Sequence, residues 1–499
     1  MLVGRVLTID DLPDDDLLEI FDFYVVRYQD LGFREFSNYD TKRRVESWKS
    51  LVHVCRRWRG LVFGSPRRLN LQLLCIPGTS LGKTLDVWPP LPLLIKGDIM
   101  ESTVDSVIAI LKHSDRICQI ELDFDVDFDI NSPQCENLFK ALQVPFPELV
   151  VLYLSLQHFW YWSAFPESFL GGSAPPRLRF LNLVSVSFPG FSSLLSTATH
   201  LVNLYLHDIP HSGHIPPEEM ATCLSMLTSL ETLHLSFDSR LSFDHRLSVE
   251  SYPDRENRRS LPPTRSILPV LTSFSFKGTN EYLDDLVSRI DAPQLHRLSI
   301  TFFDHLGFDA REIIQFIRHT PTFGAYNETR LIFHLGEALV KLDSLPEPSG
   351  HRMVEVKISS KDWQLASLTN ICTSSLRLLL TTENLYIGGY RYILRGWTDL
   401  IEGTKWLDLL LPFTAVKNLY LSKHFLPRIT PALQELTGVR TTEVLPALKN
   451  VFLEGFQPLE PVQEVIAQFI SARQLANRPV TISVWHRDPV WDKWEVGDR

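Results

Sequence analysis

A short segment between residues 211 and 219 combines side-chain types that bind transition metals. It carries two imidazoles and two carboxylates, at His211, His214, Glu218 and Glu219. Imidazole nitrogen and carboxylate oxygen are common ligands of zinc in proteins. Two consecutive prolines, Pro216 and Pro217, interrupt the segment, and the sequence offers no second cluster to complete the site. We therefore interpret the segment as a polar loop and expect no metal centre.

Cys55 is a second residue with the chemistry of a catalytic group, since a thiolate is a strong nucleophile. It lies on an apolar helical stripe, between Val54 and basic residues, which favours packing in a core over catalysis. The sequence contains no Walker loop, no Gly-x-Gly-x-x-Gly and no Gly-x-Ser-x-Gly motif. We predict that the protein is not an enzyme and requires no cofactor.

A third group consists of five carboxylates at alternate positions from residue 121 to 129. The segment from Ile120 to Ile130 alternates apolar and acidic residues, which predicts a half-buried strand with one acidic face. The acidic residues are Glu121, Asp123, Asp125, Asp127 and Asp129. Three interpretations stay open: a solvated sheet face, a dock for a basic segment, or a calcium site. Calcium is the least favoured, because a strand arranges its ligands along a line.

A repeated leucine pattern predicts the elements that position these groups. The pattern Leu-x-x-Leu-x-Leu, or a close variant, begins at residues 149, 178, 201, 230, 271, 295, 416 and 448. It is the signature of the leucine-rich repeat, in which each repeat supplies one strand and a helical or irregular return. Segments with helical periodicity lie between copies, at residues 217–227, 283–290 and 310–319. We predict an α/β fold: a curved parallel sheet with outer helices, forming an irregular solenoid over residues 71–488.

Other segments extend this prediction. A strand is predicted at residues 67–73 and a helix at 103–112. Weaker strand patterns occur at 330–335, 353–358, 384–387 and 480–485, and the repeat boundaries between 330 and 400 stay undefined. Residues 250–265 are predicted to form a mobile loop. The tail, residues 489–499, carries two tryptophans that could cover the end of the solenoid.

The N-terminal region, residues 12–74, shows two short amphipathic stripes. Pro13 suits the first turn of a helix, and the three aspartates after it suit the positive end of the helix dipole. The first stripe comprises Leu17, Leu18, Phe21, Tyr24 and Val25. The second comprises Trp48, Leu51, Val52, Cys55, Trp58 and Val62, with Ser47 as a candidate cap. Two such helices need each other and a partner surface to bury their stripes.

These residues resemble an F-box, the helical module by which substrate receptors dock on the Skp adaptor of cullin–RING ubiquitin ligases. The resemblance rests on Leu12-Pro13, on Leu17-Leu18-x-Ile20-Phe21, and on Val54-Cys55-x-x-Trp58. It implies a module over residues 1–70 that binds a Skp adaptor through Leu12, Pro13, Leu17, Leu18, Ile20, Phe21, Val54, Cys55 and Trp58. The sequence departs from the family in the insert at residues 23–46, which separates the two pieces.

Composition and charge limit the alternatives. The net charge of −10 argues against a general nucleic-acid-binding protein. Residues 1–33 hold two basic and eight acidic groups, whereas residues 34–68 hold ten basic and three acidic groups. The basic segment could steer an acidic partner, as Skp adaptors are, or form a solvated helix face. The six cysteines lack paired spacing, which indicates free thiols in a reducing compartment, the cytoplasm or the nucleus. We expect no signal peptide and no membrane span.

The resemblance to an F-box implies a substrate-recognition subunit of a Skp–cullin–F-box ubiquitin ligase. The alternative is a leucine-rich-repeat scaffold with no ligase role. We expect the protein target to lie on the strand face opposite the leucines, with a basic end near the acidic strand. The predicted contacts are Asp123, Asp125, Asp127, Tyr153, Tyr205, His207 and His234. An aromatic run at residues 158–162, including Trp160, could supply a further recognition surface or fill the core.

Overall fold

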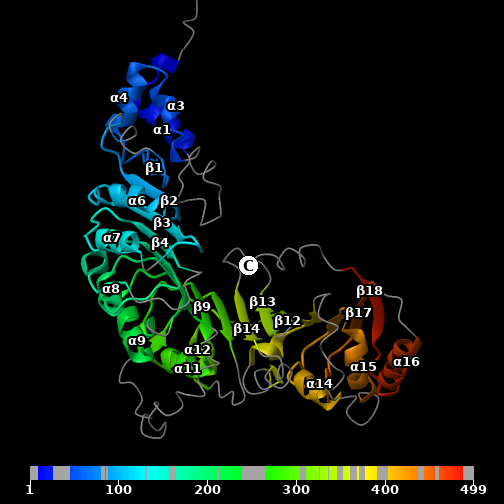
Figure 1. Cartoon of the computed structure of the whole chain (residues 1–499). Coiled ribbons are helices and arrows are strands. Elements are labelled where there is room, and N and C mark those ends of the chain that lie inside the picture. Colours follow the sequence, from blue (N-terminus) through cyan, green and yellow to red (C-terminus); the bar gives the residue numbers. More distant parts are fainter. Residues whose placement is uncertain are drawn as a thin grey trace, which may run out of the picture. The chain divides into compact units, whose positions relative to one another are not determined.

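The computed structural model gives a mixed α/β protein with a large, mostly parallel sheet (Figure 1). It describes residues 9–25, 45–79, 85, 88–129, 132–156, 165–210, 213–238, 265–303, 311–324, 326–334, 337–344, 352–359, 368–369, 372, 377–389, 403–423, 425–435, 443–455 and 460–486. The chain divides into two compact units, residues 1–215 and 216–499. Among the described residues, no helix is both long and apolar enough to cross a membrane.

The first unit begins with a helical module, which we define as residues 9–25 and 45–70. Its elements are η1 (Ile9–Asp11), α1 (Asp14–Tyr24), α3 (Lys49–Val52) and α4 (Arg56–Gly64). The predicted second helix is therefore wrong in one respect, since it breaks at residues 53–55. The predicted Ser47 cap is also wrong, because the N-cap residue of α3 is Trp48, and no side chain caps this helix. Leu17, Leu18 and Phe21 are buried as predicted, whereas Tyr24 is exposed.

The strands of the first unit follow one another in chain order and are parallel. They are β1 (Leu73–Cys75), β2 (Leu93–Ile99), β3 (Ile117–Phe124), β4 (Val151–Ser155), β5 (Phe180–Val184) and β6 (Asn203–Ile209). The helical segments between them are α6 (Val104–Leu111), α7 (Pro133–Ala141), η3 (Phe169–Gly171) and α8 (Phe191–Thr197). The predicted helix at 103–112 is confirmed as α6. Apolar side chains such as Phe124 and Phe139 pack between sheet and helices.

Two predicted strands of this unit are wrong in their extent. Residues 66–70 form turns closed by bonds such as Leu71 N–H to the Pro66 carbonyl, and Asn70 has a positive φ of 47°. Extended structure therefore begins only at Leu73. The predicted strand 120–130 ends at Phe124, because the Asp125 side chain and carbonyl accept hydrogen bonds from the next turn. Alternation of apolar and polar residues cannot by itself distinguish such turns from strands.

The second unit contains α9 (Pro217–Met226), α11 (Asn280–Arg289) and α12 (Arg311–His319) beside strands β7 (Thr232–Phe237), β9 (Ser273–Gly278) and β11 (Arg297–Phe302). A small parallel pair joins β8 (Ser266–Ile267) and β10 (Ile290–Asp291). The later strands are β12 (Glu328–His334), β13 (Glu337–Asp343), β14 (Met353–Ser359), β15 (Asn384–Gly389), β16 (Asn418–Leu421), β17 (Asn450–Glu454) and β18 (Thr481–Trp485). The remaining helices are η6 (Arg377–Thr381), α14 (Gly403–Leu410), α15 (Leu426–Glu435) and α16 (Glu460–Leu475).

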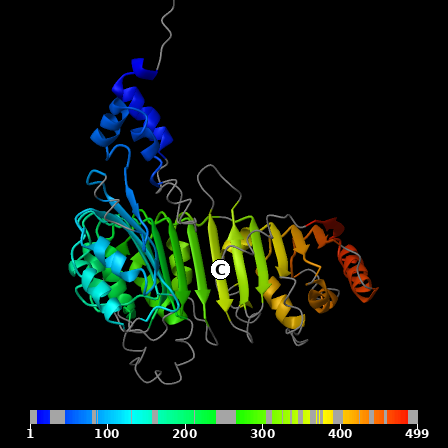
Figure 2. The same ribbon diagram turned by 45° about the horizontal axis from the view of Figure 1, so that its top comes forward.

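The strand order of this unit reverses once, so the prediction of a wholly parallel sheet is wrong here. After β11 the order is β14, β13, β12 and then β15, and β13 is antiparallel to both of its neighbours. Only two residues separate β12 from β13, a connection that suits an antiparallel hairpin. Figure 2 shows these strands side by side within the second unit.

The leucine pattern correctly predicts the strands and their inward-facing residues. Each of the eight copies coincides with a strand, and their first residues, from Leu149 to Leu448, are almost completely buried. Phe333 of β12 contacts Trp406 of α14 and Phe425 beside α15, which identifies the helix-covered face of the sheet. We call the opposite face of each sheet its open face; it carries residues such as Tyr153 in the first unit and Tyr386 in the second.

Candidate functional site

Arg57 links the two pieces of the helical module, residues 9–25 and 45–70. Its guanidinium donates from Nη2 to the Leu12 carbonyl and to Asp14 Oδ1, both at 2.6 Å, and from Nε to Asp14 Oδ1 at 3.1 Å. The Phe21 and Trp58 rings lie 4.7 Å apart between the same helices. Residues separated by the insert therefore meet in one packed unit, although most of the insert lies outside the described residues.

The nine predicted adaptor contacts divide into three groups by burial. Leu17, Leu18 and Phe21 are buried, Leu12, Cys55 and Trp58 are half-buried, and Pro13, Ile20 and Val54 are exposed. Ile20 shares one face of α1 with Phe23 and Tyr24, which are also exposed. The prediction that Cys55 packs in the core is wrong. Cys55 is half-buried and caps the N-terminus of α4, where its Sγ accepts the Trp58 N–H at 3.4 Å. The module thus keeps an apolar surface that its own packing does not use.

The acidic strand is smaller than predicted and is partnered. Glu121 is buried and pairs with Lys96 Nζ at 2.8 Å. Asp123 accepts a hydrogen bond from the Tyr153 hydroxyl at 2.9 Å. Partial withdrawal of this carboxyl from water raises the pKa of Asp123, and the hydrogen bond from Tyr153 opposes that shift. Asp125 and Asp127 lie in the turn after the strand, so they do not extend the carboxylate row.

Other predicted target contacts are brought together only in part. Tyr153, Asn182 and Tyr205 occupy neighbouring positions on β4, β5 and β6, and the Tyr205 and His207 rings are parallel at 6.0 Å. His234 belongs to the second unit, where it pairs in register with Ser275. Trp160 and the aromatic run lie outside the described residues, as do the predicted loop from 250 to 264 and the tail tryptophans.

The second unit holds an aromatic row that we did not predict from the sequence. Tyr386 and Tyr420 stack at 4.2 Å, and Tyr420 and Phe452 at 4.5 Å. Trp485 meets Tyr420 edge-on at 5.6 Å, and the Arg330 guanidinium lies 5.8 Å from the Tyr386 ring. A recurring pattern could have revealed this row: Asn-apolar-aromatic-apolar begins at residues 384, 418 and 450.

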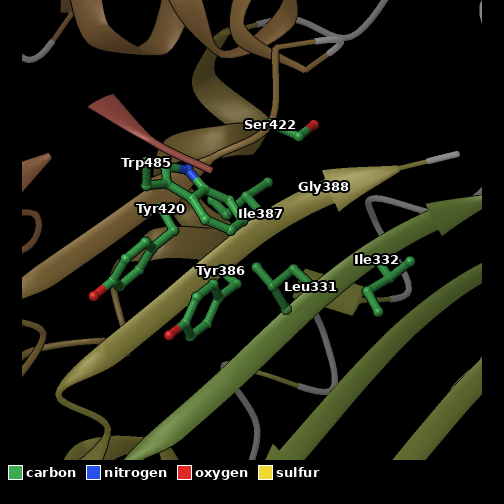
Figure 3. A pocket seen from close by; sticks show the side chains of 8 residues that line it. All are labelled: Leu331, Ile332, Tyr386, Ile387, Gly388, Tyr420, Ser422 and Trp485. Carbon is green, nitrogen blue, oxygen red and sulfur yellow. The ribbon is translucent and has the colours of Figure 1, made fainter. Parts of the chain in front are cut away.

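An amide ladder and a hollow flank the aromatic row. The ladder consists of Asn384, Asn418 and Asn450, linked by Nδ2-to-Oδ1 hydrogen bonds of 2.7 and 2.8 Å. The hollow is shallow and open to solvent, with a cavity volume of about 20 Å³, and is lined by Leu331, Ile332, Tyr386, Ile387, Gly388, Tyr420, Ser422 and Trp485. Figure 3 shows the two tyrosine rings side by side, with their hydroxyls pointing the same way and Trp485 above them.

The cysteines and acidic groups show no assembled reactive centre within the described residues. All six cysteines are free thiols, and burial raises the pKa of Cys75 to about 11 and that of Cys372 to about 12. A raised thiol pKa lowers the thiolate fraction and therefore the reactivity. In the part of the chain that the structure describes, no three His, Cys, Asp or Glu side chains are placed to hold a metal ion; His211 lies outside that part.

Comparison with known proteins adds no assignment: no protein-family model matches the chain, and no curated protein shows significant sequence similarity to it.

Proposed function

We propose that this protein is a substrate-recognition subunit of a Skp–cullin–F-box ubiquitin ligase. The observation that supports it is the helical module, in which two F-box-like pieces pack together and leave Pro13, Ile20 and Val54 exposed. An exposed apolar surface of this kind suits a partner with an apolar groove. The receptor itself performs no chemistry; it raises the local concentration of its target near a ubiquitin-charged enzyme.

The repeated strand-and-helix units support the second half of the proposal, a leucine-rich-repeat solenoid that presents the target-binding surface. Such architectures offer a long row of side chains to a protein partner. In the first unit this surface comprises Asp123, Tyr153, Tyr205 and His207, which are polar and aromatic with little net charge. A partner segment with a basic end near Asp123 would complement it.

Co-purification with a Skp adaptor tests the ligase role. Val54 is 59% exposed, so an aspartate there leaves the packing of the module intact while opposing an apolar, acidic partner. We expect Val54→Asp to weaken adaptor binding by about 2 kcal/mol or more, roughly 30-fold. Val126→Asp is a matched control, because Val126 is 60% exposed and lies outside the module. Wild-type adaptor binding by Val54→Asp would refute this assignment of the surface.

The alternative, a repeat scaffold without a ligase role, predicts that even the wild-type chain captures no adaptor.

Target binding is tested separately, once a target has been captured with the wild-type chain. Asp123→Asn should slow association at low salt, because rim charges act mainly on encounter. Tyr205→Ala should speed dissociation, because aromatic anchors hold the bound state. If neither variant changes binding, the target does not lie on the open face of the first unit.

A further inference from the structure

The sheet of the second unit ends in β18, whose outer edge pairs with no other described strand (Figure 1). The Thr481 N–H and the Trp485 carbonyl bond to the residues that flank β17, at 2.9 and 3.1 Å. Backbone groups of successive strand residues point to opposite sides, so those of Ile482 and Val484 point away from β17. Two N–H donors and two carbonyl acceptors are therefore presented at this edge. Such an edge is a template for one further strand.

The apolar side chains of β18 are less covered than their counterparts in β17. Val484 is 55% exposed, whereas Leu453, its register partner in β17, is 1% exposed. Ile482 is half-buried, whereas its register partner Val451 is buried. These positions share the helix-covered face of the sheet, and each strand of a repeat architecture relies on its neighbours to cover that face. The edge at β18 therefore lacks an apolar cover as well as a hydrogen-bonding partner among the described residues.

A cationic corner lies beside the start of β18. Arg478 is exposed and donates from Nη1 to the Pro446 carbonyl at 2.7 Å. Burial and the positive charge of Arg478 both lower the pKa of Arg473, so two guanidinium groups share this corner. In the part of the chain that the structure describes, no carboxylate forms a salt bridge with Arg478. A strand added to this edge should therefore carry a negative charge beside the start of β18.

Residues 487–499 follow β18 directly and lie outside the described residues. Their sequence suits an antiparallel strand on this edge. Pro489 has no N–H for a ladder, so pairing can begin at residue 490 or 491, after a short hairpin loop. In an antiparallel pair that starts at His486, Asp498 then lies opposite residue 478 or 479. In either register its carboxylate reaches the cationic corner at Arg478.

The same tail carries apolar side chains for both faces of an added strand. Trp491 and Trp494 are an odd number of positions apart, so in a strand they point to opposite faces in either register. One of them would cover Ile482 and Val484 on the helix-covered face. The other would lie on the open face, beside the end of the aromatic row at Trp485.

We propose that residues 490–498 form an antiparallel strand on β18 and cap the sheet of the second unit. The covalent connection favours this occupant, because a short linker gives an effective concentration in the millimolar range. A second copy of the chain would meet a strand of only five residues, whereas stable interfaces bury about 1,200–2,000 Å². The capped edge offers no template to other chains, so the tail keeps the protein from edge-to-edge association. This role is independent of any ligase function.

Residue-resolved hydrogen–deuterium exchange of the full-length chain tests the proposal, because the amides of Ile482 and Val484 do not bond to β17. Both amides should exchange slowly in the wild-type chain. The double variant Trp491→Ala/Trp494→Ala should speed their exchange at least about tenfold, because it removes the apolar anchors of the added strand. The amide of Ser483, which points toward β17, should keep its protection.

Asp492→Ala/Lys493→Ala is a matched control in the same tail. It should change the exchange of the two edge amides less than about twofold, because exposed charges contribute little. Fast exchange of Ile482 and Val484 in the wild-type chain would overturn the proposal, as would equal protection in the tryptophan double variant. Protection that depends on protein concentration, with a dimer in light scattering, would assign the edge to a second copy instead.

A charge swap tests the direction of the added strand. Asp498→Lys and Arg478→Glu should each speed exchange of the edge amides about twofold to fivefold at low salt, because each places like charges together. The combined variant Arg478→Glu/Asp498→Lys restores opposite charges and should return the exchange toward the wild-type rate. A combined variant that exchanges as fast as the faster single variant would refute the antiparallel placement of the tail.

Discussion

Trp48 should anchor the helical module to the first strands, and its removal should unfold that module alone. The side chain is completely buried, and its Nε1 donates at 3.0 Å to the carbonyl of Gln72, directly before β1. The ring lies 5.9 Å from Phe63 and 5.2 Å from Trp88. One residue therefore joins packing within the module to the edge of the sheet.

The loss of unfolding free energy in Trp48→Ala follows from the cavity that the substitution leaves and from the lost hydrogen bond to Gln72. Truncation of a buried tryptophan to alanine costs about 3–5 kcal/mol. The unpaired Gln72 carbonyl adds roughly 1–3 kcal/mol. The sum approaches the whole stability of a small domain, so Trp48→Ala should open α1 and α4. Trp48→Phe keeps most of the ring and should cost about 1–3 kcal/mol, mainly through the carbonyl.

Hydrogen–deuterium exchange measured by mass spectrometry can show which elements lose protection in the variant. We expect faster exchange in α1 and α4 for Trp48→Ala, with the strands β16 and β17 unchanged, because Trp48 contacts Phe63, Gln72 and Trp88 of the first unit and local unfolding affects the elements in contact with the lost side chain. Trp406→Ala, at an equally buried tryptophan of the second unit, should give the opposite distribution. Unchanged protection in α1, or equal loss in β16 after Trp48→Ala, would refute this reasoning.

Three further predictions concern single groups. Cys55 is half-exposed, whereas Cys75 is buried and its pKa is raised to about 11. A maleimide should therefore label Cys55 before Cys75. Peptide analysis after brief labelling checks this order. The raised pKa of Asp123 means that the folded state binds the carboxyl proton more tightly than the unfolded chain does. The contribution of this proton to stability is therefore present at low pH and is lost as pH rises through the folded pKa. Asp123→Asn should flatten the pH dependence of the unfolding free energy in urea titrations, and an unchanged pH profile would contradict this prediction. Arg473 is buried and donates to the carbonyls of Leu445 and Leu448, so Arg473→Met should lower the free energy of unfolding by about 1–3 kcal/mol, measured by urea denaturation of the second unit's signal.

The sequence alone determined the local elements and their buried sides. A strand with apolar residues at alternate positions encodes its inward face without reference to any other strand. For this reason the leucine copies from Leu149 to Leu448 all predicted strands, and segments such as 217–227 predicted helices. The burial of Leu17 and Phe21 followed from helical spacing in the same way. Where alternation continued into a turn, as after Phe124, the local pattern could not indicate the end.

Tertiary structure alone decided which elements became neighbours. The β14–β13–β12 reversal depends on pairing between whole strands, which the alternation within each strand does not specify. The contact of Phe21 with Trp58 joins residues that lie on either side of the insert at residues 23–46. The aromatic row, the amide ladder and the hollow at Gly388 exist because strand register aligns residues more than 30 positions apart in the chain, at spacings of 34 and 32. Side chains that are single, unremarkable positions in the sequence become one surface only when the strands lie side by side.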